Sequence, residues 1–215
     1  KKNNLVKLTW GNASVKSEDS KYVAIKPSGV DFFDLNFSHI SILELFTAKH
    51  LEGLQPSVDT PLHLEIYKSF PEINSVIHTH SKYATSWAQA NLSIPILGTT
   101  HADYFLGSIP LARNLEEKEL NNYEENIGRS VVDFYQSNKI NPLNMPAILL
   151  PGHGVLCFSD NIKRTLEAAI VVEEIAEIAF NTMMLNPEKV NNKFDSVLFE
   201  KHYERKNGIN KYYGQ

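Results

Sequence analysis

The sequence predicts an α/β fold in which helices pack around a mostly antiparallel sheet. Apolar residues alternate as in strands in several short runs, and elsewhere they recur every three or four residues, as in amphipathic helices. The two patterns are mixed without the regular strand-helix-strand succession that builds a parallel sheet. The 215 residues, 42% of them hydrophobic, can bury one sizeable core, so we expect one domain over residues 1–215 rather than two small ones.

The first third of the chain is predicted to hold short strands and turns. Residues 5–8 and 22–25 are apolar runs of strand length, and Gly11-Asn12 marks a break between them. Residues 42–46 fit a strand or a helical turn, because so short an apolar run does not distinguish the two. Three further strand patterns lie at residues 75–80, 148–150 and 155–158.

Three helices are predicted between and after these strands. A Thr-Pro pair opens the first, over residues 60–71. Apolar residues three and four apart predict an amphipathic helix over residues 120–134. A long apolar pattern predicts another over residues 161–184, started by Ser159 or Asp160.

Charge and composition exclude several classes of protein. Lysines and arginines number 21 against 25 aspartates and glutamates, a formal charge of −4, so nucleic acid is not an expected partner. No apolar run approaches the roughly 20 residues that span a bilayer and no signal-peptide core follows Lys1, which predicts a cytoplasmic protein without membrane contact. Cys157 is the lone cysteine, so histidines and carboxylates would have to hold any transition metal.

Histidines at the ends of predicted strands are candidate metal ligands. His78 and His80 lie two apart in a strand pattern, so their side chains point to one face about 6.6 Å apart, a gap that one ion can bridge. Their alternative interpretation is a hydrogen-bonded pair at a strand end. His153 lies between two glycines in a tight loop that joins two buried strands, where the backbone can turn sharply and present the imidazole.

Two more residues are candidates for the same site. His101 is one, although a histidine in a polar loop is more often solvated or structural. Asp59 directly precedes Thr60, so it is either a metal ligand or an ordinary capping carboxylate of the predicted helix. Three imidazoles and one carboxylate would suit zinc or a similar divalent ion.

Three turns of small residues could hold a phosphate group. Gly11-Asn12, Ser28-Gly29 and Ser57 can offer backbone N–H groups and a hydroxyl to an anion. Such residues are also common in turns for conformational reasons alone. The pattern therefore leaves two interpretations, a phosphate clamp and ordinary loops.

Six segments of the sequence form a recognisable set. They are residues 9–12, 26–31, 59–61, 78–81, 98–105 and 211–215. Together they resemble the L-ribulose-5-phosphate 4-epimerase family of the class II aldolase/epimerase superfamily. The Thr-Thr-His-Ala-Asp loop and the Tyr-Tyr-Gly-Gln ending separate these epimerases from the fuculose- and rhamnulose-phosphate aldolases. Before that ending, residues 198–208 are patterned as a helix with an Asn-Gly stop.

The resemblance implies a three-layer α/β/α sandwich, a cyclic homotetramer and active sites between subunits, to which the tail of residues 209–215 contributes. It also implies a sugar phosphate as substrate and one divalent ion per subunit, with Zn²⁺ expected. Position by position, it implies the metal ligands Asp59, His78, His80 and His153, the acid–base pair Asp103 and Tyr213, and the substrate contacts Gly11, Asn12, Ser28, Gly29, Ser57, Val58 and Asp59. Val58 stands where the family has a second serine, so only its backbone N–H could contribute.

The implied reaction interconverts L-ribulose 5-phosphate and D-xylulose 5-phosphate. The hydrogen on carbon 4 is not acidic, since no carbonyl group adjoins it, so inversion is expected to proceed by cleaving and re-forming the bond between carbons 3 and 4. A divalent ion would stabilise the negative charge that cleavage creates. Two acid–base groups on opposite faces are also needed, and Asp103 and Tyr213 are the candidates, with Tyr213 reaching in from an adjacent subunit.

Three alternatives stay open from the sequence. A sugar-phosphate aldolase of the fuculose or rhamnulose type would use the same metal chemistry. A metallohydrolase of the amidohydrolase type also has a His-x-His pair, but its barrel needs about 250 residues and eight strand-helix repeats. A non-enzymatic metal-binding or assembly protein would give the tail no chemical role.

Overall fold

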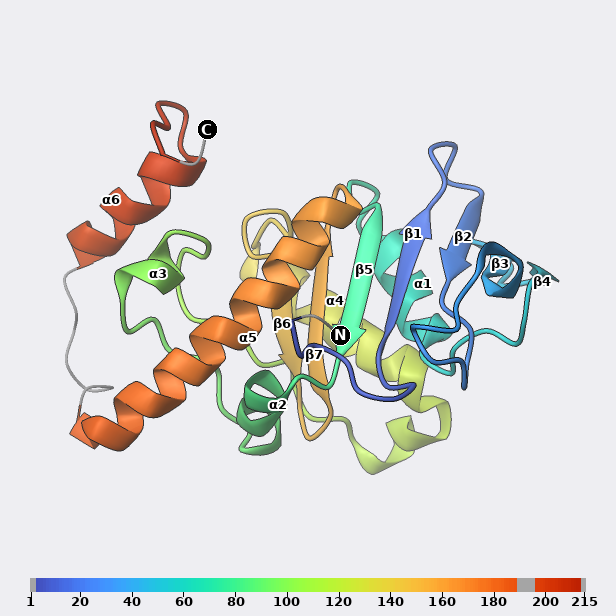
Figure 1. The fold of residues 1–215 in the computed structure, drawn as a ribbon, viewed down its shortest axis with the longest axis horizontal. Coiled ribbons are helices and arrows are strands. Elements are labelled where there is room, and N and C mark those ends of the chain that lie inside the picture. The colour runs from blue at the N-terminus through green and yellow to red at the C-terminus, as the bar shows by residue number, and fades with distance from the viewer. Residues whose placement is uncertain (1–2, 189–195, 214–215) are drawn as a thin grey trace.

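The computed structural model describes residues 3–188 and 196–213 and contains a seven-stranded antiparallel sheet, ordered β4-β3-β2-β1-β5-β7-β6 (Figure 1). The strands are β1 (Asn12–Lys16), β2 (Tyr22–Ile25), β3 (Ser41–Glu44), β4 (His50–Glu52), β5 (Ser75–Thr79), β6 (Ala147–Leu150) and β7 (Gly154–Ser159). The predicted antiparallel sheet is confirmed. The ends of the predicted domain and tail, residues 1–2 and 214–215, lie outside the described residues.

Helices cover both faces of the sheet. They are α1 (Thr60–Ser69), α2 (Lys82–Gln89), α3 (Thr99–Ala102), α4 (Tyr123–Asn138), α5 (Ile162–Leu185) and α6 (Ser196–Asn207), with the short 3-10 helices η1 (Phe37–His39) and η2 (Glu117–Asn122). In Figure 1, α5 crosses in front of the sheet and packs against α2, while α1 and α4 pack against each other behind it. The predicted three-layer α/β/α sandwich is therefore confirmed, with α3 and α6 packed together beside it.

The side of the sheet formed by β5, β7 and β6 is largely apolar. Every residue of β6 and β7 is buried, and Leu156 and Phe158 are fully enclosed. Leu62 and Ile66 of α1 cover one face, and Val172 of α5 belongs to the same buried core. Each such side chain contributes roughly 1.5–3 kcal/mol by leaving water. This core gives the loops at the ends of β5, β6 and β7 a firm base.

The strand predictions for the first third need one correction. Residues 5–8 lie in a loop, and the strand follows them as β1. The buried positions of β1 are Asn12, Ser14 and Lys16, so alternating hydropathy does not reveal this strand. The run at 42–46 is a strand, β3, rather than a helical turn.

The helix predictions hold with shifted ends. The helix expected at residues 60–71 is α1, and the one at 120–134 begins as η2 and continues as α4. The cap of α5 is Asn161, whose side chain accepts a backbone N–H of the first turn, so the prediction of Ser159 or Asp160 is wrong. Within the described ranges, no helix combines the length and apolarity needed to cross a membrane.

Candidate metal centre

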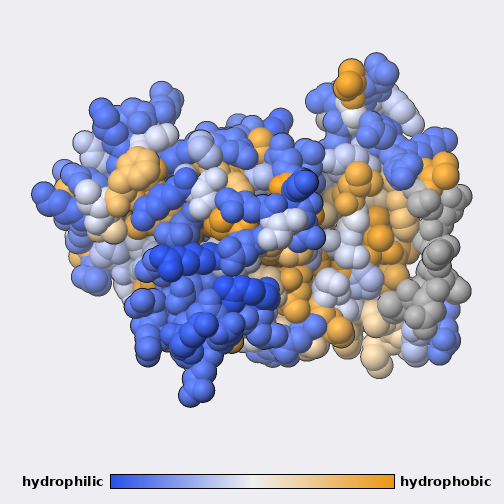
Figure 2. Space-filling view, turned by 180° about the vertical axis from the view of Figure 1, so that it is seen from behind, coloured by the Kyte–Doolittle hydropathy of each residue, from blue (hydrophilic) through white to orange (hydrophobic). Residues whose placement is uncertain are grey.

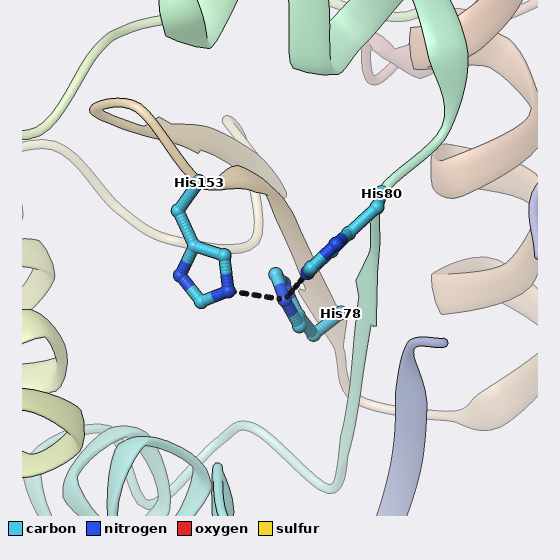
Figure 3. Close-up of side chains that lie close together, drawn as sticks. All are labelled: His78, His80 and His153. Carbon is cyan, nitrogen blue, oxygen red and sulfur yellow. Dashed lines mark hydrogen bonds between the residues drawn. The ribbon is translucent and has the colours of Figure 1, made fainter. Parts of the chain in front are cut away.

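Three histidines converge at one end of the sheet. His78 lies in β5, His80 directly follows that strand, and His153 lies in the turn between β6 and β7. The Nε2 atom of His78 is 2.9 Å from Nε2 of His80 and 3.2 Å from Nε2 of His153 (Figure 3). The structure thus brings together the three histidines predicted as ligands, with their ligand atoms all within 4.8 Å of one another.

The strand register explains this convergence. β5 and β7 pair through Thr79 and Val155, so the turn before β7 lies beside the end of β5. A Cβ on Gly154 would lie 2.5 Å from the carbonyl oxygen of Thr79. It would also lie 3.2 Å from the rings of His78 and His80. Glycine is therefore required where β7 begins, because a Cβ would clash with the backbone of Thr79 and press on both ligand rings.

Hydrogen bonding and burial prepare the imidazoles for metal binding. Nδ1 of His78 donates to the carbonyl oxygen of Val155 at 3.0 Å, so in the neutral ring Nε2 carries the lone pair that faces the centre. Burial lowers the pKa of His78, His80 and His153 below the ordinary histidine value. The rings are therefore neutral at neutral pH, which is the form that binds metal ions.

The three donors fit a divalent metal ion. Nε2 of His78 has one lone pair and can accept one well-aligned N–H, yet two further ring nitrogens lie within 3.2 Å of it, so one cation among the three rings satisfies them better than any arrangement of their protons. Tetrahedral zinc, with Zn–N bonds of about 2.0–2.1 Å, holds its nitrogens about 3.3 Å apart. Two of the three separations, 2.9 and 3.2 Å, are close to that spacing, and all three are within 4.8 Å. Imidazole donors also suit zinc and similar transition metals better than magnesium or calcium.

Asp59 places a negative charge beside the histidines. It occupies the N-cap position of α1, yet within the described chain its side chain makes no cap hydrogen bond and accepts instead from Nδ2 of Asn12 at 2.6 Å. The capping interpretation is therefore wrong. The carboxylate partly offsets the effect of burial on the pKa of His80 and His153, which places it within electrostatic reach of both rings. Its role as a fourth ligand stays a prediction, since only the three histidines form the converging group among the described residues.

Some of the predicted phosphate residues adjoin this centre. Nδ2 of Asn12 also donates to Oγ of Ser57 at 3.1 Å, so Asn12 links Ser57 to Asp59. Ser28, Ser57 and Val58 line one pocket of about 580 Å³. The backbone N–H of Ser28 donates to the carbonyl oxygen of Gln55 at 2.9 Å, so this amide is not free to bind an anion and only the side chain could do so.

The two glycines of the predicted clamp have left-handed backbones. Gly11 has φ +77° and Gly29 has φ +69°, a region that residues with a Cβ rarely adopt. A Cβ on Gly11 would lie 2.8 Å from the carbonyl oxygen of His78. Gly11 thus lets the loop before β1 approach the metal centre closely.

His101 lies away from this cluster and has a structural role. It is 4% exposed, and Nε2 donates to the carbonyl oxygen of Gly107 at 2.8 Å. Burial lowers its pKa to about 4, so the ring is neutral at neutral pH. The interpretation of His101 as a structural histidine is confirmed, and its hydrogen bond closes the loop that carries α3.

Asp103 and Tyr213 meet through a third residue, Arg205. Asp103 directly follows α3 and accepts from Nε and Nη2 of Arg205 at 3.1 and 3.0 Å, and from Nδ1 of His202 at 3.0 Å. The guanidinium of Arg205 lies 4.5 Å from the centre of the Tyr213 ring. Sequence reasoning missed His202 and Arg205, although both belong to the predicted helix at 198–208 and are spaced three apart, on one helical face.

Within one chain, the Asp103 region lies apart from the histidines. In Figure 1, α3 and α6 lie at one side of the sandwich, whereas the ends of β5 and β7 that carry the histidine cluster lie near its middle. The structure therefore brings together the metal-ligand candidates as one group and the acid–base candidates as another.

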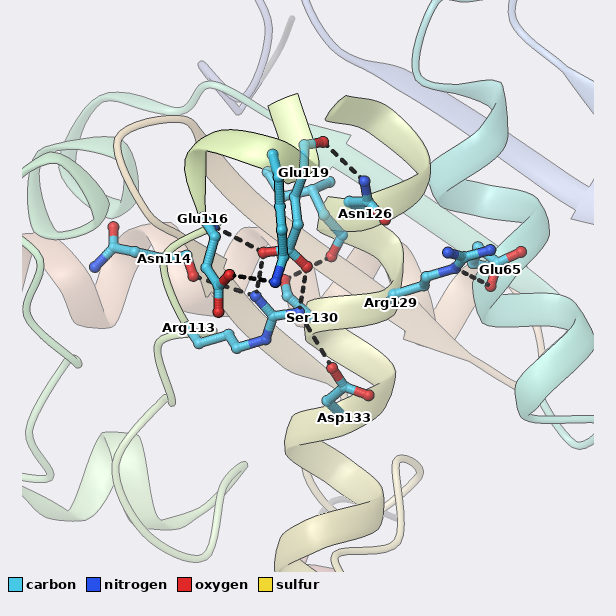
Figure 4. Close-up of polar contacts among 11 residues, drawn as sticks. Glu65, Arg113, Asn114, Glu116, Glu119, Asn126, Arg129, Ser130 and Asp133 are labelled. Carbon is cyan, nitrogen blue, oxygen red and sulfur yellow. Dashed lines mark hydrogen bonds and ion pairs between the residues drawn. The ribbon is translucent and has the colours of Figure 1, made fainter. Parts of the chain in front are cut away.

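Tyr123 contacts the histidine cluster, and a network of surface ion pairs fixes the turn before it. Oη of Tyr123 lies 3.2 Å from Nδ1 of His153. The turn before Tyr123 is fixed by a capping box between Glu116 and Glu119, and Arg113 donates to both carboxylate oxygens of Glu119 at 2.8 Å (Figure 4). Sequence reasoning gave Tyr123 no functional role, because the hydropathy pattern places it on the apolar side of the predicted helix at 120–134.

Comparison with known families and structures agrees with this fold. Residues 1–180 match the family described as Class II Aldolase and Adducin N-terminal domain. The chain belongs to this family.

Solved structures of similar fold include several aldolases. One described as L-fuculose 1-phosphate aldolase is 25% identical, with a TM-score of 0.75 over 94% of this chain and 90% of that one. An L-fuculose-1-phosphate aldolase from Thermus thermophilus is 19% identical, with a TM-score of 0.66 over 86% and 90%. A sugar-phosphate aldolase from Thermotoga maritima is 20% identical, with a TM-score of 0.63 over 85% and 89%. The last two likenesses concern the fold alone.

Proposed function

We propose that this protein is a metal-dependent epimerase that interconverts L-ribulose 5-phosphate and D-xylulose 5-phosphate. The observation that carries the proposal is the cluster of His78, His80 and His153 with the Asp59 carboxylate beside it. Epimerase activity, rather than simple cleavage, is favoured by Asp103 and Tyr213, which the sequence motifs mark as an acid–base pair.

The chemistry needs charge stabilisation and two proton transfers. A divalent ion, with Zn²⁺ as our expectation, supplies Lewis-acid stabilisation of the negative charge that cleavage between carbons 3 and 4 creates. Asp103 and Tyr213 act as the general acid–base pair. One accepts the proton of the 4-hydroxyl group, and the other donates a proton to the oxygen on carbon 4 after the aldehyde has presented its other face.

The phosphate-bearing fragment has to stay bound between cleavage and re-addition. The side chains of Asn12 and Ser57, with the pocket lined by Ser28 and Val58, are proposed to hold its phosphate group. A fragment that escaped would turn the epimerase into an aldolase, because rebinding is slow compared with reaction inside the site. Val58 is 67% exposed and offers no hydroxyl, so this clamp relies on fewer side chains than that of the resembling family.

We further propose that the site forms between subunits of a homotetramer. The distance between α3–α6 and the histidine cluster in one chain supports this arrangement (Figure 1). The rear face is largely hydrophilic, but apolar surface gathers on the half that includes α6 (Figure 2). Apolar surface of this kind is typical of interfaces.

Mixing two inactive variants tests the assembly. His153→Ala removes a metal ligand and Tyr213→Phe removes the phenol, so each homotetramer should be inactive. If each site combines residues of two subunits, random co-assembly restores about a quarter of the sites, each with both residues intact. Activity of the co-expressed mixture that stays at the level of the separate variants would overturn the shared site.

A sugar-phosphate aldolase is the second candidate, favoured by the 25% identity to an L-fuculose 1-phosphate aldolase. The purified protein, loaded with zinc and analysed for bound metal, is incubated with L-ribulose 5-phosphate. D-xylulose 5-phosphate as the main product supports the epimerase, and released glycolaldehyde phosphate as the main product supports the aldolase. Activity on L-fuculose 1-phosphate with no conversion of the pentulose would also overturn the proposed function.

A further inference from the structure

A row of buried polar side chains begins beside the metal centre and continues between β1 and α1. Asn12, Ser14 and Lys16 occupy the buried positions of β1. On α1, Asp59 is followed at four-residue spacing by His63 and Tyr67, so the three share one helical face. Asn12 contacts Asp59, and Ser14 contacts both His63 and Tyr67.

His63 is the unexplained member of this row. It is completely buried, and its Nδ1 lies 2.7 Å from Oγ of Ser14. Its Nε2 has no hydrogen-bond partner among the described residues. A buried N–H group without a partner destabilises a fold, and an apolar side chain at the same place would avoid that cost.

The neighbouring hydroxyls decide which nitrogen of His63 carries the proton. Burial raises the pKa of Tyr67, so its hydroxyl stays protonated, and among the described residues Oγ of Ser14 is the acceptor within hydrogen-bond distance of it. The Tyr67 hydroxyl therefore donates to Oγ of Ser14 at 2.7 Å, and Ser14 donates its own proton to Nδ1 of His63. The remaining ring proton is on Nε2, which makes the unpartnered atom a donor.

The surroundings of that donor include the metal centre. The backbone N–H of His63 donates to the carbonyl oxygen of Asp59 one turn earlier, at 3.3 Å, so the two side chains follow each other on the helix. Burial lowers the pKa of His63, and the nearby Asp59 carboxylate partly offsets that effect, so Asp59 belongs to the electrostatic surroundings of the ring. Oδ1 of Asn12, whose amide holds Asp59, is a second buried atom without a partner in the described chain.

We propose that His63 is a positioning residue of the metal centre: when the ion is bound, its Nε2–H, which has no partner among the described residues of this structure, donates to the Asp59 carboxylate and keeps it directed at the three histidines. Ser14 and Tyr67 hold the ring in the required tautomer. This inference rests on the proposed function only in so far as the centre binds a divalent ion, and it does not depend on which sugar phosphate is converted. Partners that orient a ligand in this way commonly affect metal affinity by about 10- to 100-fold.

Two substitutions of His63 separate positioning from packing. His63→Gln puts an amide nitrogen near the place of Nε2 and keeps a donor toward Asp59. His63→Asn reaches only the place of Nδ1, so it can contact Ser14 but not Asp59. Both remove the ring, so a purely structural role predicts the same loss for both. Tyr135→Phe serves as a control, because the Tyr135 hydroxyl is buried and donates to Met145 and Ala147 in another part of the core.

The measurement is the zinc affinity of the full-length, metal-stripped protein, from competition with a chromophoric chelator, together with the melting temperature without metal. We expect His63→Asn to weaken zinc binding about 10- to 100-fold and His63→Gln to retain affinity within about threefold of wild type. Tyr135→Phe should lower the melting temperature and leave zinc affinity unchanged.

The outcomes distinguish this inference from the proposed function. Suppose the wild-type protein binds zinc and His63→Asn and His63→Gln bind it with equal affinity, whether unchanged or equally weakened. That result overturns the role of His63 and leaves the epimerase proposal standing. Failure of the wild-type protein to bind any divalent metal overturns both. If His63→Asn does not fold, Ser14→Ala tests the same relay with the ring intact, and unchanged zinc affinity in that variant contradicts the proposal.

Discussion

The histidine cluster and the Asp103–Tyr213 group are held in place by different forces. His78 lies in β5, His80 directly follows it and His153 lies in the β6–β7 turn, so backbone pairing among these three strands fixes their positions. Asp103 follows the four-residue helix α3, and side-chain hydrogen bonds from α6 hold it. Changes in the first region should therefore remove the metal, whereas changes in the second should lower turnover and leave the metal bound.

The largest effect is expected from His153→Ala. Loss of one of three imidazoles leaves two donors for the ion, so bound zinc should fall below one equivalent and epimerisation should fall by more than about 10³-fold, since Lewis-acid stabilisation contributes several kcal/mol. Metal analysis and a coupled assay for D-xylulose 5-phosphate measure both quantities. His39→Ala changes a half-buried histidine of η1 that lies outside the cluster, and it should leave both unchanged. Full metal content in the His153 variant would contradict the assigned ligand set.

Tyr213→Phe should affect turnover almost as strongly, with no loss of metal. Removal of a general acid–base group costs about 10²- to 10⁴-fold in rate, while the ring itself can still stack on Arg205. Tyr212→Phe is the matched control at the next position and should retain activity. Normal turnover in the Tyr213 variant would leave the tail without a chemical role.

The sequence predicts the first of these regions better than the second. His78 and His80 share a strand face through the two-residue period, and the glycines around His153 indicate a tight turn. Strand register then brings the turn beside β5 without any help from distant side chains. Local patterns were therefore sufficient to select all three histidines.

The second region depends on contacts that local patterns do not encode. Asp103 and Arg205 are 102 residues apart in the chain and meet only because α3 packs on α6. β1 was missed for a related reason, since its buried side chains are polar and are satisfied by α1. Hydropathy predicts burial in an apolar core, and it fails where burial is made favourable by long-range polar partners.

The loop that carries α3 is held by the buried, neutral His101 as well as by the charged contacts of Asp103. The pH dependence of the free energy of unfolding tests the contribution of His101. The pKa of His101 is about 4 in the folded protein, against 6.5 when the ring is free. Above pH 6.5 the ring is neutral in both states. As the pH falls toward 4, the unfolded chain binds the proton first, so stability is lost in this window, by up to about 3 kcal/mol.

Urea unfolding of the metal-free protein at pH 7 and pH 4.5 measures this loss. In His101→Gln the amide can still donate to Gly107 but does not titrate, so this variant should lose less stability between the two pH values. The metal-ligand histidines are the same in both proteins, and their contribution cancels in the difference. An equal loss in wild type and variant would mean that His101 is not held neutral by burial.

The smallest effect is expected from Arg205→Lys, and it compares the two regions most directly. Lysine keeps the positive charge but cannot give Asp103 two parallel hydrogen bonds or stack flat on Tyr213, so the acid–base pair should lose its fixed geometry. We expect a decrease in kcat of about tenfold, since small misplacement of reacting groups is costly, with zinc content unchanged. Arg164→Lys alters an exposed pair with Asp160 and should leave kcat at the wild-type value. Loss of zinc in the Arg205 variant would show that the two regions are coupled within one chain, because a side-chain contact of α6 would then support the strand-based site.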